Sequence, residues 1–410
     1  MGFAQTADVL VIGAGPAGCM ASTYLVKEGF SVLCLERGFF PRHVIGESLL
    51  PRTNELLQRV GLLEAVEERL YMPKYGALFL RGPQRERFCF AEALKGDYPS
   101  SFQVPRADFD QTLASHTRKM GVDIRFGHSV NDVQFHQDHV VAQVCEEENS
   151  NTFEVSTQFV LDCSGYGRVL PRLLELEEPS SLPTRVACYT QWEGDIRPDG
   201  NEAGDIWVCV HPENGWIWHI PFSNGRTSVG LVCDPEYWDS FEGSSQQKMA
   251  SYLQMEPNSW ERLHKGQSVW PTREIRGYST KVKQWFGERW ALAGNAGDFL
   301  DPVFSSGVTL ALETAYAAAQ LTVQTLRGEE ANWDSDYKKV IEQATEVFRA
   351  FITSWYSREL EAIFFSELKL PRMKKRITSI LGGYVLREDN PLNDQPAKSL
   401  HQLYELLPST

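Results

Sequence analysis

The stretch ADVLVIGAGPAGCMASTYLVKEGFSVLCLER, residues 7–37, decides how the fold begins. Residues 7–12 form a short apolar run that predicts a strand, and residues 16–27 carry Ala, Met and Leu on one helical face. Glycines in GxGxxG spacing, which suits a tight turn, a close approach to a pyrophosphate and helix packing, lie between them: Gly13, Gly15 and Gly18. Glu36 ends a second apolar run about 20 residues later, where a carboxylate can accept hydrogen bonds from a ribose. The segment predicts a bound adenine dinucleotide, either NAD or FAD.

The composition and charge of the chain restrict its function. Its 410 residues, at roughly 150 residues per domain, suggest two or three domains. With 42% hydrophobic and 11% aromatic residues, the chain is too apolar for a disordered protein. Forty basic and 54 acidic residues leave a formal net charge of −14, which repels nucleic acid and anionic membranes. We therefore expect neither as a partner.

The cysteines and the apolar runs bear on the cellular compartment. Eight cysteines are scattered without a CxxC pair or metal-ligand spacing, so we expect reduced core residues and no metal site. No uninterrupted apolar run approaches the ~18 residues of a membrane-spanning helix. The N-terminus lacks the basic start and cleavage site of a signal peptide. The expected location is the cytoplasm.

Three later segments resemble the FAD-dependent monooxygenase superfamily: RHVIGESLLP (42–51), VPRADFD (104–110) and FVLDCSG (159–165). The resemblance implies that the GES segment runs beside a flavin and that Arg106 contacts the cofactor. It also implies that the strand ending at Asp162 closes the cofactor site with a tight turn. For Arg106 the alternative is an ordinary charge at a helix start.

The chain returns to this site at ALAGNAGDFLDPVFSSGVTL, residues 291–310, where a strand and a glycine turn lead into a helix that reaches about Leu326. In the superfamily this helix start lies under the pyrimidine edge of the flavin. Free N–H groups and the helix dipole favour negative charge on a reduced flavin, so FAD fits better than NAD. The predicted cofactor-binding residues are Gly13, Gly15, Gly18, Glu36, Arg37, Gly46, Glu47, Ser48, Arg106, Asp162, Gly165, Asn295, Asp301, Pro302 and Gly307.

The remaining sequence predicts two further parts. Residues 183–235 alternate apolar and polar residues between Asp-Gly and Asn-Gly turns, which predicts antiparallel strands. After Asn332 the chain becomes helical, with an aromatic stripe that is either core or, less favoured, a substrate entry. The expected fold class is α/β: a Rossmann-like FAD-binding domain of the p-hydroxybenzoate-hydroxylase type (1–180 and 281–330), an antiparallel-sheet substrate domain (181–280) and a C-terminal helical region (331–410).

Residues 214–221 read NGWIWHIP and contain WxWxIP, which resembles the marker of flavin-dependent halogenases. On a strand, Trp216 and Trp218 share one face because side chains alternate, so they can form an indole wall beside the flavin. In the family this wall is thought to keep organic substrates away from the flavin. A plain core strand is the alternative, and the GES segment, Lys74 and the DPVFSSG segment argue against it.

The resemblance implies a mechanism. Halogenases use reduced FAD from a separate NAD(P)H flavin reductase, with O2 and chloride or bromide, to make hypohalous acid that travels to a lysine near the substrate. The matching lysine is Lys74, which either hydrogen-bonds the hypohalous acid as an ammonium or becomes a haloamine as a neutral amine. The backbone N–H groups of Ser306 and Gly307 are the predicted halide site, unless they serve the flavin alone.

One departure from the family pattern indicates the substrate class. Tryptophan halogenases carry a glutamate in the helix-start motif, where this chain has Phe304. The chain therefore resembles the branch that acts on electron-rich pyrroles and phenols, and its compact length resembles the enzymes that act on pyrroles tethered to a carrier protein. A basic cluster is either a docking site for an acidic carrier or a solvated face: Lys369, Arg372, Lys374, Lys375 and Arg376.

Four functions compete for these motifs. A flavin monooxygenase shares the fold and lacks only the halide step, whereas a flavin reductase of prenyl double bonds shares only the early motifs. A flavin-binding sensor would leave Lys74 and the tryptophan pair without a purpose. A halogenase accounts for all of them, with phenol halogenation and hydroxylation as the alternatives to halogenation of a tethered pyrrole.

Overall fold

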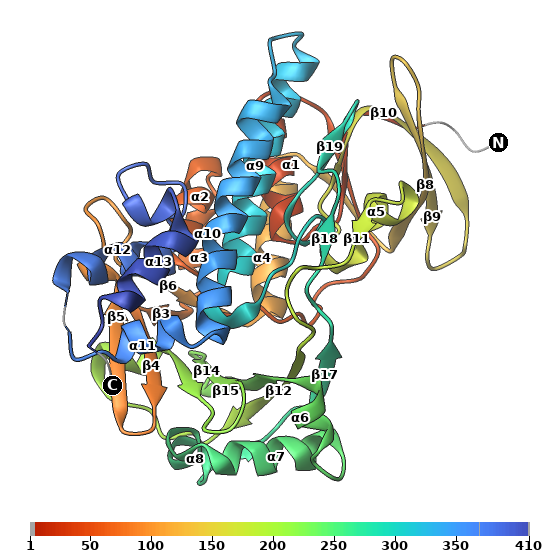
Figure 1. The fold of residues 1–410 in the computed structure, drawn as a ribbon. Helices are drawn as coiled ribbons and strands as arrows, with labels where there is room; N and C mark the ends of the chain where they lie inside the picture. Colours follow the sequence, from red (N-terminus) through yellow and green to blue (C-terminus); the bar gives the residue numbers. More distant parts are fainter. Residues whose placement is uncertain (1–4, 369, 409–410) are drawn as a thin grey trace.

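The computed structural model describes residues 5–368 and 370–408. It contains the sheet that the opening glycine motif predicts, whose main strands are parallel except for the edge strand β19 (Figure 1). Its strands, in the order β19-β20-β10-β1-β2-β7, are β19 (Phe286–Gly287), β20 (Trp290–Leu292), β10 (Thr152–Asp162), β1 (Gln5–Ile12), β2 (Val32–Glu36) and β7 (Asp123–Phe126). Ile12 is level with Asp162 and with Leu35, so the glycine turn emerges in the middle of the carboxyl edge.

The side chains of β1 alternate between two cores because successive residues of a strand face opposite sides. Val9 and Val11 face the helices, and Leu10 faces the hairpin on the other side. The helical layer consists of α1 (Pro16–Lys27), α2 (Pro51–Val60), α3 (Leu63–Glu67), α4 (Arg106–Lys119) and α9 (Ser306–Leu326). The opposite layer consists of β8 (His128–Phe135), β9 (Val140–Glu146) and α5 (Val169–Leu173).

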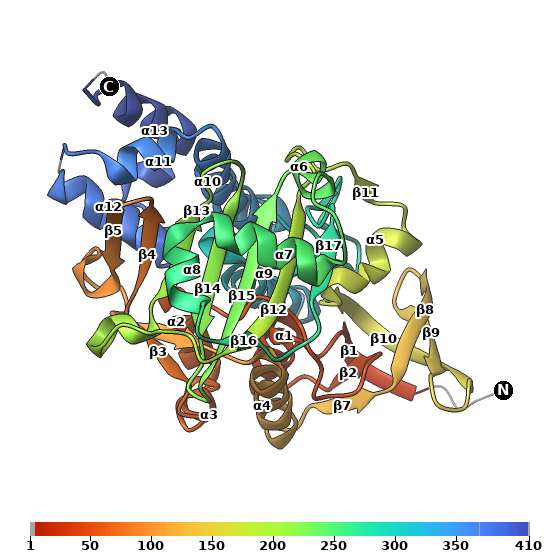
Figure 2. The same cartoon turned by 90° about the horizontal axis from the view of Figure 1, so that it is seen from below.

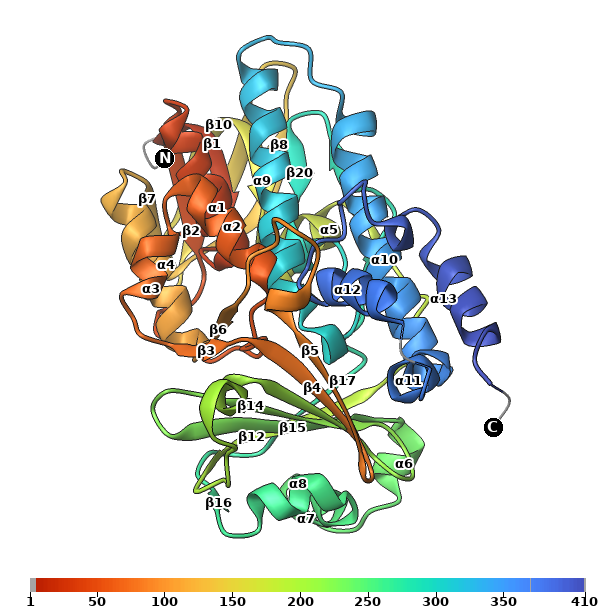
Figure 3. The same ribbon diagram turned by 90° about the vertical axis from the view of Figure 1, so that its left-hand side faces the viewer.

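A second sheet lies below the first part of the molecule (Figure 3). Its main strands, in the order β16-β12-β15-β14-β13-β4-β5, are β16 (Gln267–Ser268), β12 (Val186–Glu193), β15 (Arg226–Cys233), β14 (Trp216–Pro221), β13 (Ile206–Val210), β4 (Gly76–Arg81) and β5 (Gln84–Cys89). β17 (Arg273–Arg276) also pairs with β12. The outer face is covered by helices that the sequence did not predict, as Figure 2 shows: α6 (Pro235–Asp239), α7 (Ser245–Met255) and α8 (Pro257–Leu263).

The two sheets are not formed by two separate stretches of the sequence. β4 and β5 come from residues predicted for the FAD-binding part, yet they extend the second sheet. β4 also pairs with β13 in parallel, whereas antiparallel pairing alone was expected for this sheet. The two strands follow directly on β3 (Met72–Lys74), which pairs with β6 (Ser101–Gln103) in a small sheet of its own. Lys74 therefore lies where the chain passes from one part to the other.

The C-terminal helices pack beside both parts (Figure 1). They are a π turn (Trp333–Lys338), α10 (Lys339–Tyr356), α11 (Glu359–Phe365), α12 (Pro371–Leu381) and α13 (Pro396–Glu405). Phe348, Phe351 and Trp355 of α10 are buried in one cluster with Phe304 and the inner face of the second sheet. The interpretation of this aromatic stripe as core is thus confirmed.

All eight cysteines are free, and six of them are buried, as expected for reduced core residues. Among the residues that the structure covers, none of the helices combines the length and apolar character needed to cross a bilayer. The same residues contain no group of His, Cys, Asp or Glu arranged to hold a metal ion.

Candidate active site

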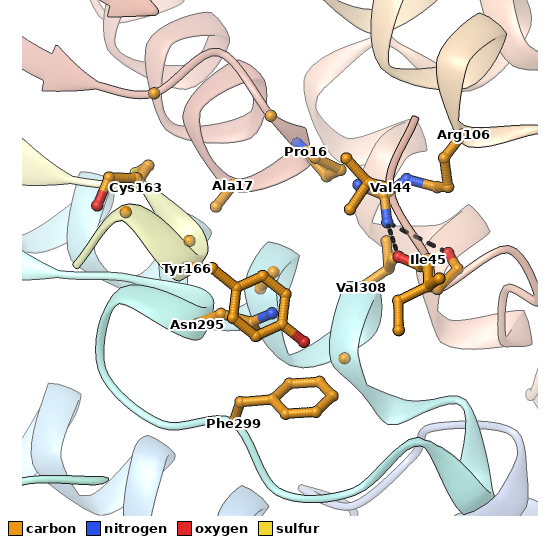
Figure 4. Close-up of a pocket in the computed structure, with 18 of the residues that line it drawn as sticks. Pro16, Ala17, Val44, Ile45, Arg106, Cys163, Tyr166, Asn295, Phe299 and Val308 are labelled. Carbon is orange, nitrogen blue, oxygen red and sulfur yellow. Dashed lines mark hydrogen bonds between the residues drawn. The ribbon is translucent and has the colours of Figure 1, made fainter. Parts of the chain in front are cut away.

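A cavity of about 810 Å³ lies between the carboxyl edge of the first sheet and the inner face of the second. Predicted cofactor residues from five separate stretches of sequence line it: Gly13, Gly15, Glu36, Arg37, Gly46, Glu47, Ser48, Arg106, Gly165, Asn295, Pro302 and Gly307. Figure 4 shows part of this cavity, with Arg106 on one side and Asn295 and Tyr166 on the other. The fold thus gathers residues that are up to about 290 positions apart, at a size typical of cofactor sites.

The glycine turn forms a cradle that a side chain would fill. Gly13 has a φ of +97°, and a Cβ atom there would lie 2.6 Å from the carbonyl oxygen of Cys163. A Cβ atom on Gly18 would lie 1.8 Å from the carbonyl oxygen of Gly13. The first turn of α1 has neither a side-chain cap nor an acidic residue. Its free N–H groups suit a pyrophosphate, so this site fits FAD.

Glu36 lies at the end of β2 beside the glycine turn. Its Oε2 atom accepts a hydrogen bond from the N–H of Ala14 at 3.0 Å, and Oε1 accepts one from Gly38 at 2.9 Å. Both bonds hold the carboxylate at the cavity wall. This is the place where the dinucleotide fingerprint requires an acceptor for a ribose hydroxyl.

Residues 44–48, which we call the strap, cross the cavity beside α9. The guanidinium of Arg106 donates from Nη1 to the carbonyl oxygens of Ile45 at 2.9 Å and Gly46 at 3.3 Å, as the dashed lines of Figure 4 mark. The same side chain is fixed by a bidentate pair with Asp110. Arg106 therefore holds the strap in place, besides lining the cavity.

Glu47 and Ser48 of the strap are buried polar residues in the cavity wall. Burial raises the pKa of Glu47 to about 7, because a carboxylate loses its hydration there. Its Oε1 atom and the hydroxyl of Ser48 have no hydrogen-bond partner within the described chain. Such atoms suit a polar ligand, because buried polar groups are normally paired.

Three of the predicted cofactor residues do not line the cavity. Gly18 packs against the glycine turn. The carboxylate of Asp162 accepts from the backbone N–H groups of Ser164 and Leu170, and so shapes the turn after β10. Asp301 accepts from Val303 N–H and from the hydroxyls of Tyr278 and Tyr356. Both aspartates organise the backbone around the site.

Trp216 and Trp218 lie side by side on the inner face of β14 and line the cavity. Their ring centroids are 5.8 Å apart, and Ile217 between them faces the outer core. Trp216 donates from Nε1 to the hydroxyl of Tyr356 at 3.1 Å, and Trp218 donates to that of Ser228 at 3.2 Å. The shared face that alternation predicts is present, and hydrogen bonds fix both indoles.

Lys74 is buried at the end of β3 and does not line the cavity. Its Nζ atom donates to the carbonyl oxygen of Leu49 at 2.9 Å and lies 5.5 Å from the ring centroid of Phe90. Burial lowers the pKa of the amine to about 7. The hydrogen-bond partner of the amine, Leu49, is the direct neighbour in sequence of Ser48 in the cavity wall.

The start of α9 forms the floor of the site. Ser305 is the N-cap residue with a φ of 57°, and both Ser305 and Gly307 line the cavity. Ser306 lies between them with 2% of its surface exposed and outside the cavity lining. Of the two predicted halide residues, only Gly307 therefore reaches the cavity, and Ser305, which was not predicted, reaches it as well.

Several aromatic residues line the cavity without having been predicted: His43, Tyr166, Tyr189 and Phe299. The ring of Tyr166 projects into the cavity and meets that of Phe299 edge-on, at a centroid distance of 5.4 Å (Figure 4). Tyr166 stands between Gly165 and Gly167, directly after the DCSG turn. This position next to a predicted motif could have identified Tyr166 from the sequence. The other three rings reach the cavity through tertiary packing.

Comparison with known proteins places the chain in a family. Residues 6–337 match the family model described as FAD binding domain. The chain is 28% identical to a 1H-pyrrole-2-carbonyl-[peptidyl-carrier protein] chlorinase of Pseudomonas fluorescens (92% of this chain, 89% of that protein). It is 31% identical to a flavin-dependent halogenase of Armillaria mellea (78% and 68%). A crystal structure of a flavoprotein/dehydrogenase from Cytophaga hutchinsonii superposes with a TM-score of 0.95 at 40% identity (98% of both chains).

Proposed function

Because this chain belongs to the flavin-dependent halogenases of the FAD binding domain family, we propose that it halogenates an electron-rich aromatic ring, specifically a pyrrole bound as a thioester to a carrier protein. The reaction would consume reduced FAD from a separate NAD(P)H flavin reductase, O2, and chloride or bromide. The cytoplasm is the proposed location. The observation that carries the proposal is that the buried amine of Lys74 binds Leu49, directly after the strap, and that the strap lines the cofactor cavity together with Trp216 and Trp218.

The chain's own residues would hold the cofactor in a fixed order. The N-terminus of α1 and the glycine turn would bind the pyrophosphate, and Glu36 the ribose. Arg106 would position the strap against the flavin. When bound in its reduced form, FAD would supply two electrons that bring O2 to the peroxide level, and this oxygen would be the two-electron oxidant that converts halide to hypohalous acid. Trp216 and Trp218 would keep the aromatic substrate away from the flavin and leave passage only for a small oxidant.

The halide would bind at the start of α9. The left-handed backbone at Ser305 is followed by free N–H groups in the first helical turn, where the helix dipole favours an anion. The cavity lining at Gly307 places that turn beside the flavin site. Ser306 would contribute only its backbone N–H to the halide site, because its side chain is buried away from the cavity.

Lys74 would act on the hypohalous acid after it has passed the strap. With a pKa near 7, the amine has both protonation states available at neutral pH. The charged form would hydrogen-bond and polarise the electrophile, and the neutral form would become a haloamine. Either role requires an amine that is shielded from water, because bulk water would compete for the oxidant.

The substrate class rests on the absence of a carboxylate at Phe304 and on the relatives. Phe304 is buried against Phe351 and Trp355 of α10, which gives this region an apolar aromatic character. Electron-rich rings such as pyrroles and phenols need little help from a base in electrophilic substitution. A pyrrole is favoured over a phenol because the chlorinase of Pseudomonas fluorescens acts on a carrier-bound pyrrole and matches nearly the full length of this chain.

The proposed docking site for the carrier is α12. Arg372 and Lys375 are exposed on this helix and form no ion pair with another described residue, whereas Lys374 pairs with Glu86. Lys369, which was also predicted for this cluster, lies outside the described residues. α12 packs on the turn at residues 90–92, and Phe90 of that turn covers Lys74. A carrier on α12 would therefore sit over a short path to the amine.

The test compares wild type with Lys74→Ala, using candidate pyrroles as free acids and as carrier thioesters. Wild type with reduced FAD, O2 and bromide should give a halogenated product by mass spectrometry. The variant should bind FAD and consume O2 normally but yield no halogenated product. Full halogenation by the variant would contradict the role of Lys74, and hydroxylated product from wild type would favour a monooxygenase. Equal turnover of free and tethered acids would contradict the requirement for a carrier.

A further inference from the structure

Asp205 is a buried acid next to Lys74 that the proposed reaction leaves without a role. It stands between the 3-10 turn at Gly200–Gly204 and the start of β13. That turn contacts β3 so closely that a Cβ atom on Gly204 would lie 1.8 Å from the carbonyl oxygen of Pro73. A Cβ atom on Gly76 would lie 3.3 Å from Oδ2 of Asp205. The turn therefore lies against the backbone just before Lys74, and the carboxylate of Asp205 lies near the backbone just after it.

The carboxylate of Asp205 is held on one oxygen only. Oδ2 accepts a hydrogen bond from Nε of Arg87 at 2.6 Å. Oδ1 is buried and has no hydrogen-bond partner in the described part of the chain. The turn that carries Asp205 is fixed by Gln103, whose side-chain amide donates to the carbonyl oxygen of Gly204 at 2.9 Å. An unpaired buried carboxylate oxygen is costly unless a positive charge faces it.

Among the residues that the structure describes, the amine of Lys74 lacks acceptors for some of its hydrogen bonds, just as Oδ1 of Asp205 lacks a donor. Its ammonium can donate three hydrogen bonds, and one bond, to Leu49, is formed. Loss of hydration lowers the pKa of the amine to about 7, and the negative charge of Asp205 acts in the opposite direction. Two other charged groups, Arg87 on β5 and Glu202 on the turn, act on Asp205.

We propose that Asp205, fixed by Arg87, is the positioning residue of Lys74 and favours the charged form of this buried amine. The role of Lys74 in halogenation rests on the proposed function, but the charge coupling between the two side chains does not. With Asp205 present, the ammonium form of Lys74 dominates below neutral pH. Of the two roles open to the lysine, Asp205 thus favours polarisation of the electrophile by charge.

The test is a double-mutant cycle between Asp205→Asn and Lys74→Met, with unfolding by denaturant followed from pH 6 to pH 10. The coupling between the substitutions should be largest below pH 7 and should vanish by about pH 9, where Lys74 is neutral in the native state. Removing the carboxylate should lower the pH at which Lys74 titrates by about one unit. In the halogenation assay, the limb of the pH profile that depends on Lys74 should move by the same amount.

Glu202→Gln is the matched control, because Glu202 is an acid on the same turn that pairs with Arg85 at 3.3 Å on the surface. Glu202 acts weakly on Asp205 and not directly on Lys74, so the control should move the titration of Lys74 far less than Asp205→Asn does. If Asp205→Asn folds poorly, Asp205→Ser serves instead, since it also removes the carboxylate and should shift the titration of Lys74 in the same direction. A coupling of zero, or one that does not change with pH, would overturn the proposal. Halogenation by Lys74→Met would refute the role of the lysine and leave the coupling result standing.

Discussion

At the scale of single residues, the site depends on polar groups buried away from water. Lys74 and Glu47 are nearly fully buried, and Glu47 lies in the cavity wall whereas Lys74 does not. Burial moves the pKa of both groups to about 7, from opposite directions. Small changes around either group therefore alter its charge at neutral pH, which makes these two positions the most sensitive to pH.

Burial of the Lys74 amine should lower the free energy of unfolding at neutral pH. In the unfolded chain Lys74 is charged up to about pH 10.5, whereas in the native state it loses its proton near pH 7. The unfolded state thus binds more protons between these values, and stability rises with pH across that window. Lys74→Met should raise the free energy of unfolding at pH 7 by up to about 4 kcal/mol and remove this rise. Denaturant titrations at pH 7 and pH 9 measure both effects, with the exposed Lys95→Met as control. A variant less stable than wild type at pH 7 would contradict the expectation.

At the scale of elements, the position of the Trp218 indole depends on the small residue opposite it in the neighbouring strand. Trp218 of β14 is level with Gly230 of β15, and a Cβ atom on that glycine would lie 2.1 Å from the indole. Gly230→Ala should push the indole into the cofactor cavity, lower the free energy of unfolding by about 1–3 kcal/mol and weaken FAD binding. Val229→Ala removes packing on the opposite face of β15 and should destabilise without affecting FAD affinity. Fluorescence titration of FAD separates the two, and equal affinities in both variants would argue against the wall's contact with the cofactor.

The start of α9 provides a second test at this scale. Ser305 holds a left-handed backbone that glycine adopts more easily, so Ser305→Gly should raise the free energy of unfolding by about 1 kcal/mol. Ser306→Gly, one residue further into the helix, should lower it by up to about 1 kcal/mol. Both variants keep their backbone N–H groups, so the KM for halide should stay unchanged. A large rise in that KM for Ser306→Gly would mean that a hydroxyl binds the halide.

Local patterns predicted some elements well and missed others for physical reasons. The helix from Pro16 to Lys27 and the tryptophan strand follow from periodicity and glycine spacing, which are properties of the local sequence. The cavity position of His43 and the pairing of Asp205 with Arg87 arise from tertiary packing, for which one sequence carries no spacing signal. Asp301 shows the reverse case, because this motif residue, predicted for the cofactor, lies outside the cavity lining and bonds two tyrosines and a backbone N–H.

At the scale of the whole molecule, the charge distribution bears on the proposed partner. The chain carries a net charge of −14, yet Arg372 and Lys375 stand exposed on α12. Reversing both charges to Glu should raise the KM for a carrier-bound substrate and remove its dependence on salt, because long-range attraction guides such encounters. Lys398→Glu on α13 is the control, and turnover of a free acid should not change in either variant. Salt-independent kinetics in wild type would exclude charge-guided docking at α12.

The path of the chain between the two sheets has a further consequence. The chain alternates between the two sheets. After β2 of the first sheet it forms β4 and β5 of the second, then β7 to β10 of the first, then β12 to β17 of the second, and finally β19 and β20 of the first. A gene fragment that encodes either half would leave severed strands along a shared border, so neither half can be excised as an autonomous unit. A chimera that exchanges the second sheet of one homologue for that of another must accordingly exchange two distant segments, the one with β4 and β5 and the one with β12 to β17.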